Sequence, residues 1–437
     1  TWPMVHAAGG ALSDSILQYA TFDHALALAA VIVAAIVAAR WSQPQVRSRD
    51  GILVAGLVAF AVSGPVFSAD VVTLGLHRNA VVTVATSAVR HALPPPASAP
   101  WAPEPLPVEE PPPPRPALSG VARGKSVIWV ALESTGARYL APWGAADDPT
   151  PRLTELVGRP GALRFDHAYA VHPESIKGLF SYLCSTWPAA HTSAAAYSHD
   201  VVPARCVGEV LGDAGYRTGL FHSGRFVYLG MADVVRDRGF DVALDAGDIG
   251  GRYASSFGTD DASTAQAVLA FLDGLDPSEP FFALYMPIAG HHPYHSPGEG
   301  LRPYPEHPPL QAYRNDLHQG DQALGLLIDG VRARGLEDNV VWVIFGDHGE
   351  AFQQHPGNFA HTLFIYDENV HVPLAVVLPE VPPGTPNRLP HVASLVDVLP
   401  TTLEVAYLNA VAKKTNNMVI KADALHYKTD VWVNAAV

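Results

Sequence analysis

Two patterns of apolar and polar residues alternate between residues 126 and 379. Short, continuous apolar runs predict strands at residues 126–132, 217–223, 280–288, 340–345 and 372–379. Interspersed with them are segments with the spacing of helices, at residues 206–216, 262–275 and 321–335. The run Val-Val-Trp-Val-Ile-Phe at 340–345 is typical of a central strand covered on both faces. This alternation indicates an α/β domain with a large, mostly parallel central sheet.

Two uncharged apolar stretches precede this domain, at residues 24–39 and 52–69. With their flanks, each approaches the length needed to cross a bilayer. The short loop between them contains Arg40, Arg47 and Arg49, which predicts that the loop is cytoplasmic and that the chain continues on the outer side. A pair of buried core helices is the alternative, but no complementary soluble segment surrounds them.

The composition changes along the chain predict four regions. Residues 1–90 form a membrane region with about two transmembrane helices, and its last stretch, 71–90, is interrupted by charge and predicts an interfacial segment. Residues 91–119 are dominated by proline, which predicts a semi-rigid, extended linker. Residues 120–410 hold the α/β pattern, and residues 411–437 form an atypical C-terminal segment.

Charge and cysteine content limit which partners and which cellular compartments are compatible with this chain. The 437 residues carry a net charge of -14, and the polar part shows no basic stripe, which argues against a nucleic-acid partner. Two cysteines, Cys184 and Cys206, are too few for a disulfide framework. One bridge between them and two free thiols are both compatible with the sequence, the bridge only in an oxidising compartment.

Acidic and histidine side chains follow two of the predicted strands. Glu133 comes directly after the run 126–132, and Asp347 and His348 follow the run 340–345. Ligands of open α/β sheets bind beyond the carboxyl ends of the strands, so these side chains are expected at one sheet edge. Two carboxylates and one imidazole suit a divalent ion such as Zn, Mn, Mg or Ca. Taken singly, Glu133 could instead cap a helix and Asp-His-Gly could form a turn.

The arrangement as a whole resembles the sulfatase-like branch of the alkaline phosphatase superfamily, which includes sulfatases, lipoteichoic acid synthases and phosphoethanolamine transferases. The resemblance runs from about Lys125 to Tyr407. The segments that carry it are, in chain order, VIWVALEST, HPESIKGLFSYLCSTWP, VGEVLGDAGYRTGLF with RGFD, FGTDDASTAQAVLAFLD, FFALYMPIAGHHPY, FGDHGEAFQQH, HTLFIYDENVHVPL and SLVDVLPTTLEVA. The resemblance implies a sulfatase-like catalytic domain with an alkaline-phosphatase-like sandwich fold, and metal-ligand positions at Glu133, Asp347 and His348.

The same resemblance implies that Ser175 is the nucleophile and a fourth metal ligand, because it precedes the segment LCSTWP at the family's spacing. Metal coordination activates a serine hydroxyl near neutral pH. Ser175 could also merely cap a helix that begins at Ile176. The two interpretations are compatible, because a helix N-terminus also binds anions.

The sequence departs from true sulfatases at the nucleophile. Their signal for conversion to formylglycine is Cys- or Ser-x-Pro-Ser-Arg, whereas this chain reads Ser-Ile-Lys-Gly-Leu from Ser175. A single Glu133 replaces their paired aspartates, and HSGRF replaces their Gly-Lys-x-His, so that Arg225 or His222 would have to substitute in binding substrate. These departures favour the membrane-anchored transferases over sulfate-ester hydrolases.

The resemblance also assigns roles to other residues around the predicted site. His291 and His361 fall at positions of histidines that contact substrate, where an imidazole can protonate a leaving alkoxide or donate to phosphoryl oxygens. His292 is a neighbouring candidate for substrate binding. Lys177, two residues beyond Ser175, is expected either to contact the substrate anion or to be solvated.

Together these features predict a metal-dependent transferase in the cytoplasmic membrane, with its catalytic domain on the periplasmic or extracellular side. It would act through a phosphoseryl intermediate on a phosphorus ester of an anionic lipid or glycan. One alternative is a hydrolase of phosphate, phosphonate or sulfate esters on the same scaffold. The other is a non-catalytic domain that binds an anionic glycan or a lipid headgroup.

Overall fold

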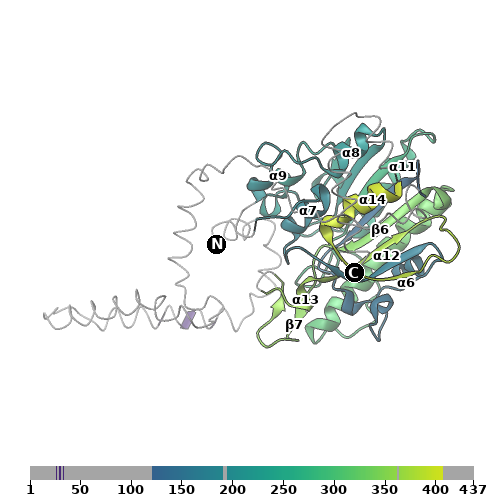
Figure 1. Cartoon of the computed structure of the whole chain (residues 1–437). Helices are drawn as coiled ribbons and strands as arrows, with labels where there is room; N and C mark the ends of the chain where they lie inside the picture. The colour runs from purple at the N-terminus through teal and green to yellow at the C-terminus, as the bar shows by residue number, and fades with distance from the viewer. Residues whose placement is uncertain are drawn as a thin grey trace. The chain divides into compact units, whose positions relative to one another are not determined.

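An eight-stranded sheet forms the centre of the described structure (Figure 1). In spatial order its strands are β10 (Arg388–Ser394), β2 (Ala162–Tyr169), β9 (His371–Val377), β6 (Val340–Gly346), β1 (Ser126–Leu132), β5 (Phe281–Met286), β3 (Arg217–His222) and β4 (Val242–Leu244). Among these strands β9 alone is antiparallel to its neighbours, β2 and β6. The other pairs are parallel. The sheet is therefore mixed, with the mostly parallel character that the sequence predicts.

The computed structural model describes residues 121–189, 194–361 and 364–406, and four helical residues, Leu26, Ala29, Ala30 and Val33. The chain divides into two compact units, Thr1–Pro100 and Trp101–Val437, and the sheet belongs to the second. Apart from those four residues, the predicted membrane stretches, the proline-rich linker and the C-terminal segment lie outside the described residues. Within the described part, no helix has both the length and the apolar character needed to cross a bilayer.

Helices cover both faces of the sheet, because side chains of the central strands alternate between two cores. In β1, Val127 and Trp129 point into one core, and Ile128 and Val130 point into the other. The first core is covered by α7 (Ser175–Cys184), α8 (Val207–Asp213), α9 (Met231–Val235) and α14 (Val398–Ala406). The second is covered by α6 (Pro151–Val157), α11 (Asp261–Asp273) and α12 (Pro309–Ala333).

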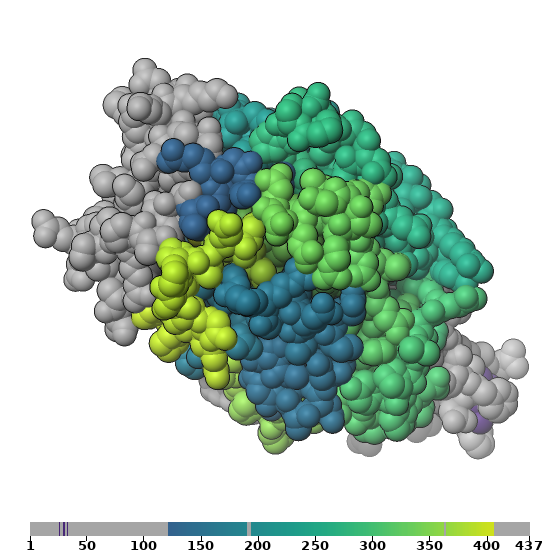
Figure 2. All heavy atoms as spheres, turned by 90° about the vertical axis from the view of Figure 1, so that its right-hand side faces the viewer, coloured from purple at the N-terminus to yellow at the C-terminus, as the bar shows by residue number. Residues whose placement is uncertain are grey.

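The helices α6 and α12 pack side by side over the second core. Figure 2 shows the blue surface around α6 next to the green surface of α12. Asp321 of α12 accepts hydrogen bonds from the backbone N–H groups of Arg152 and Leu153, at 2.9 and 2.8 Å. Asp321 thereby satisfies two N–H groups in the first turn of α6, which have no partner within that helix.

The remaining elements are short and lie in the connections. They are α10 (Ala246–Ile249), α13 (Asp367–Val370), the hairpin strands β7 (Ala351–Phe352) and β8 (Phe359–Ala360), and the 3₁₀ helices η1 (Ala137–Tyr139), η2 (Ala141–Trp143), η3 (Ala194–Tyr197), η4 (Tyr228–Gly230), η5 (Glu337–Asn339) and η6 (Leu395–Asp397). The β7–β8 hairpin directly follows the end of β6 and carries the chain to His361.

A disulfide bond joins the two helices α7 and α8 in the first core. It connects Cys184, the last residue of α7, to Cys206, which precedes the first residue of α8. Of the two states that the sequence allows for these cysteines, the structure contains the bridge.

Candidate active site

The register between β1 and β6 brings Glu133 and Asp347 together. Leu132 and Gly346, the last residues of these parallel strands, are directly paired, so the next residue of each strand lies at the same edge of the sheet. The backbone N–H of Asp347 donates to the Leu132 carbonyl at 3.1 Å. Ser134 adopts a left-handed conformation, φ 50°, and its N–H donates to Asp347 Oδ1 at 2.9 Å. The backbone after β1 thus holds the Asp347 carboxylate, and the Ser134 hydroxyl donates to Glu133 Oε1 at 2.8 Å.

His348 completes a group of three ligand-type side chains. Its ring Nδ1 lies 2.9 Å from the Gly349 carbonyl and donates to it, which leaves the lone pair of Nε2 for an ion. Nε2 lies 3.6 Å from Glu133 Oε1 and 3.6 Å from Asp347 Oδ2. One ligand atom from each of these residues lies within 4.8 Å of the others. The three atoms converge on one point, as the ligands of a divalent ion do.

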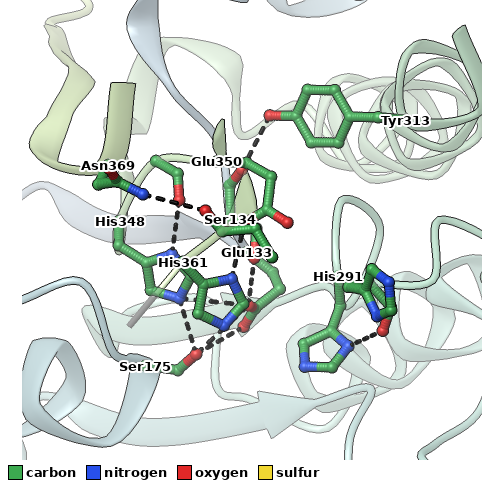
Figure 3. Close-up of polar contacts among 12 residues, drawn as sticks. Glu133, Ser134, Ser175, His291, Tyr313, His348, Glu350, His361 and Asn369 are labelled. Atoms are coloured by element: carbon green, nitrogen blue, oxygen red, sulfur yellow. Dashed lines mark hydrogen bonds and ion pairs between the residues drawn. The ribbon is translucent and has the colours of Figure 1, made fainter. Parts of the chain in front are cut away.

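Ser175 presents its hydroxyl to the same point (Figure 3). Its Oγ lies 3.3 Å from both carboxylate oxygens of Glu133 and 3.1 Å from His348 Nε2. The prediction that Ser175 caps a helix beginning at Ile176 is wrong by one residue, since α7 begins at Ser175 and Glu174 is its N-cap. The hydroxyl therefore stands on the first helical residue, beside N–H groups that have no partner within the helix.

A glycine allows α7 to approach Asp347 closely. A Cβ atom placed on Gly178 would lie 3.1 Å from the Asp347 carbonyl oxygen, which is tighter than most real Cβ contacts. The first turn of α7 thus packs directly against the residue that follows β6, and this contact fixes the distance between Ser175 and the carboxylates.

Burial shifts the protonation of all three ligand-type residues. Desolvation, followed by repulsion between the two carboxylates, raises the pKa of Glu133 to about 7. Desolvation also raises the pKa of Asp347 to about 7. The pKa of the buried His348 ring is lowered to about 4, again chiefly by burial. A neutral imidazole beside two carboxylates fits a divalent cation, which would replace the protons that burial otherwise favours.

A second histidine, His361, lies against this group. Its ring centroid is 4.2 Å from that of His348, and its Nδ1 lies 2.6 Å from Glu350 Oε2. The other carboxylate oxygen of Glu350 accepts from the Tyr294 hydroxyl, also at 2.6 Å. Because Nδ1 of His361 faces Glu350, the Nε2 edge of the ring is turned away from that carboxylate. Glu350 is not among the site residues predicted from the sequence, although it lies in the segment FGDHGEAFQQH.

His291 lies on the other side of His361. Their ring centroids are 6.1 Å apart. The His291 ring stacks on Phe257 at 4.1 Å and meets the edge of Tyr228. Its Nδ1 donates to the backbone carbonyl of His292 at 2.6 Å, which leaves Nε2 as the acceptor atom (Figure 3). Burial lowers the pKa of His291 to about 3, so the ring is neutral at physiological pH.

His292 and Arg225 have other surroundings. The His292 ring makes edge contacts with Tyr294 and Phe359. Within the part of the chain that the structure describes, the Arg225 side chain donates to the Ser256 carbonyl at 3.2 Å and is not bonded to the Ser175 group. The structure therefore brings His291 and His361 together with the ligand group, and it leaves Arg225 in the loop after β3.

Lys177 is buried and paired, with 5% of its surface exposed. Its Nζ lies 2.6 Å from Glu174 Oε2, so the expectation of a solvated lysine is wrong, and contact with a substrate anion would have to compete with this ion pair. His222, the other candidate beside Arg225, is buried with Nδ1 3.3 Å from the Met286 carbonyl.

A mixed α/β sheet with this ligand group at the ends of its central strands defines a domain of the alkaline phosphatase type. A family model described as Sulfatase matches residues 125–408, and the chain belongs to this family.

Two curated relatives from Bacillus subtilis (strain 168) are similar in sequence. The chain is 23% identical over 301 residues to the lipoteichoic acid synthase-like protein YvgJ, covering 65% of this chain and 48% of YvgJ. It is 23% identical over 256 residues to lipoteichoic acid synthase 2, covering 56% of this chain and 38% of that protein. The chain thus spans about half the length, or less, of the curated relatives it matches.

Solved structures share the fold. The lipoteichoic acid synthase LtaP from Listeria monocytogenes superposes with a TM-score of 0.58 at 19% identity, covering 68% of this chain and 74% of LtaP. The phosphoethanolamine transferase EptA, an integral membrane protein of Neisseria meningitidis, gives 0.52 at 15% identity, covering 68% of this chain and 56% of EptA. The periplasmic domain of EptC from Escherichia coli, in complex with Zn, gives 0.51 at 17% identity, covering 64% of this chain and 82% of that domain.

Proposed function

We propose that this protein is a metal-dependent phosphotransferase with Ser175 as its nucleophile. The observation that carries the proposal is the position of Ser175 Oγ, 3.1 to 3.3 Å from His348 Nε2 and the Glu133 carboxylate. Glu133, Asp347, His348 and Ser175 would hold one divalent ion, such as Zn, Mn, Mg or Ca. When bound, the ion would lower the pKa of the serine hydroxyl and offset negative charge on the substrate.

Each residue of the site would then carry out one step of the reaction. Ser175 Oγ forms a bond to the phosphorus of the substrate ester, and the bond from phosphorus to the leaving alkoxide breaks. The first-turn N–H groups of α7 donate to the phosphoryl oxygens. His361 gives a proton to the leaving oxygen. In the second half of the reaction an acceptor hydroxyl attacks the phosphoserine, passes its proton to Nε2 of the neutral His291 and through solvent back to His361, and releases Ser175.

Transfer to an acceptor hydroxyl is favoured over hydrolysis by the residues around the nucleophile. The sequence Ser-Ile-Lys-Gly-Leu from Ser175 lacks the sulfatase modification signal. The two curated relatives carry lipoteichoic acid synthase names, and EptA is named a phosphoethanolamine transferase. We accordingly take the substrate to be a phosphorus ester of an anionic lipid or glycan. His292, Lys177 and Arg225 remain candidates for binding it.

The proposed location is the outer side of the cytoplasmic membrane. Residues 1–90 would anchor the protein, residues 91–119 would act as a linker, and residues 120–410 would be the catalytic domain, followed by a terminal segment at 411–437. Support comes from the two apolar stretches and the arginines between them. The disulfide between Cys184 and Cys206 fits an oxidising compartment.

The Ser175→Ala variant tests the mechanism. It should lose turnover of bis(p-nitrophenyl) phosphate while keeping its metal, because three protein ligands remain. Mass spectrometry of the wild-type protein, quenched during turnover, should show phosphate or a phosphodiester on Ser175. Transfer of the phosphoryl group to water, compared with its transfer to added glycerol, separates hydrolase from transferase.

Ser181→Ala is the matched control, since this serine lies on the same helix and its buried hydroxyl donates to the Lys177 carbonyl at 2.7 Å. It should stay active. Full activity of Ser175→Ala would refute the covalent mechanism. A metal-loaded wild-type protein that turns over no phosphorus or sulfate ester would favour the binding-domain alternative.

A further inference from the structure

Two buried carboxylates hold the loop that carries His291. Asp261 accepts hydrogen bonds from the backbone N–H groups of Ile288 and Ala289, at 2.8 and 3.1 Å. Asp316 accepts from the N–H groups of Gly290 and Ser296, both at 2.8 Å, and from the Ser296 hydroxyl at 3.1 Å. Four backbone N–H groups of one short loop thus donate to two carboxylates that lie outside the loop.

These carboxylates come from two different helices beneath the loop. Asp261 is the first residue of α11, and Asp316 lies in the first half of α12. Their exposed fractions are 4% and 0%. Placing a carboxylate in the core costs free energy unless hydrogen bonds compensate, and here the loop provides them. Burial also raises the pKa of both groups, which reflects that cost.

The loop passes directly against the ligand group. Gly290 has a positive φ of 104°, and a Cβ on it would lie 2.4 Å from the Glu133 carbonyl oxygen. The next residue is His291, whose N–H donates to the Ile288 carbonyl at 3.1 Å. Because Ile288, Ala289 and Gly290 are fixed by the two carboxylates, the backbone that carries the His291 ring is fixed relative to Glu133.

We propose that Asp261 and Asp316 are positioning residues. They hold the backbone that carries His291 and thereby determine where its ring lies during the reaction. This inference rests on the proposed function. Neither carboxylate contacts the reacting atoms. Each satisfies N–H groups that would otherwise be buried without partners, and each thereby keeps Nε2 of His291 where it can accept the proton of an attacking acceptor hydroxyl. Small displacements of a catalytic group lower rates strongly.

A double-mutant cycle on the metal-loaded full chain tests this role. Asp316→Asn should lower kcat/KM for the acceptor glycerol about 10- to 100-fold, and should change the first release of nitrophenolate from a nitrophenyl ester less. In the His291→Ala background the same substitution should cost less than about 3-fold, because there is no longer an imidazole to position. Asp261→Asn should behave in the same way and replaces Asp316→Asn in the cycle if that variant does not fold.

Asp321→Asn provides a matched control. Asp321 lies on the same helix, is 4% exposed, and also accepts from two backbone N–H groups, but those belong to α6. It should lower the unfolding temperature without lowering kcat/KM by more than about 3-fold. Additive losses in the cycle, or an equal loss in Asp321→Asn, would overturn the inference. An inactive wild-type protein, or an active Ser175→Ala variant, would instead count against the proposed function itself.

Discussion

Glu350 connects two side chains at the edge of the site. One oxygen binds His361 Nδ1 and the other accepts from the Tyr294 hydroxyl, each at 2.6 Å. Burial raises the pKa of Glu350 to about 8, and the tyrosine hydrogen bond opposes that shift. The carboxyl group therefore fixes the rotation of the His361 ring, with Nδ1 toward Glu350 and Nε2 turned away from it.

Substitutions of His361 and Glu350 should distinguish the contribution of ring orientation to activity from that of proton transfer. His361→Ala should reduce kcat for a phosphodiester with an alkyl leaving group about 10²- to 10³-fold, as loss of one acid or oxyanion donor commonly does. Glu350→Gln should reduce it by about 10-fold, because the ring remains but its orientation is less fixed. Both defects should shrink with nitrophenolate as the leaving group, which needs little protonation. A defect that is independent of the leaving group would exclude a role in proton donation.

At the scale of elements, two helical glycines should respond differently to replacement by alanine. A Cβ on Gly178, in the first turn of α7, would lie 3.1 Å from Asp347, whereas the atom nearest to a Cβ on Gly212 in α8 would be 3.8 Å away. Gly212→Ala should stabilise the protein by up to about 1 kcal/mol through helix propensity. Gly178→Ala should gain less and should lower kcat at least several-fold, because α7 must move away from Asp347. Urea denaturation and nitrophenyl ester turnover measure the two effects, and unchanged turnover of Gly178→Ala would contradict this prediction.

Strands that consist of a continuous run of apolar residues are predicted correctly from the sequence. All five predicted strands form. The sequence does not predict β2, β4 and β10, because β4 has only three residues and because exposed or half-buried positions predominate in β2 and β10. The helix predicted at 321–335 begins at Pro309 instead. Its first half buries Asn315 and Asp316, and buried polar residues interrupt the apolar spacing on which the prediction depends.

Those site residues that belong to recognisable motifs can be predicted from the sequence. Glu133, Ser175 and the adjacent pair Asp347–His348 come from three separate segments, and the structure brings their side chains together. Glu350 does not stand out in the sequence, because an acidic residue after Asp-His-Gly is typical of a turn. The partners of its carboxylate are set by the β7–β8 hairpin and by the loop after β5, which only tertiary structure reveals.

At the scale of the whole molecule, buried carboxyl groups should make the metal-free protein less stable as pH rises. Burial raises the pKa of Asp321 to about 7 and that of Glu350 to about 8. Glu133 and Asp347, both at about 7, behave in the same way. Between about pH 6.5 and 8.5 the folded state therefore holds protons that the unfolded chain has already lost, and the free energy of unfolding must fall with increasing pH.

This dependence should weaken when a metal binds. A divalent ion bound by Glu133 and Asp347 replaces their protons, so metal binding releases protons and stabilises the fold more strongly at about pH 8.5 than at about pH 6.5. The buried histidines, with lowered pKa values, act in the opposite direction but only below their ordinary pKa of about 6.5, outside this window. Urea midpoints of the purified chain, with EDTA or with excess Zn, provide the measurement. A metal-free midpoint that rises with pH across the window would contradict the prediction.

The bond between Cys184 and Cys206 has a practical consequence for observing the site. The sequence holds two cysteines and both are in this bond, so the oxidised protein has no thiol that reacts with a maleimide. Val227 is 75% exposed and adjoins Tyr228, whose ring meets that of His291. A single cysteine introduced in place of Val227 would therefore take up one fluorophore or spin label, and its signal would report changes in the surroundings of Tyr228 and His291 without a second labelled thiol.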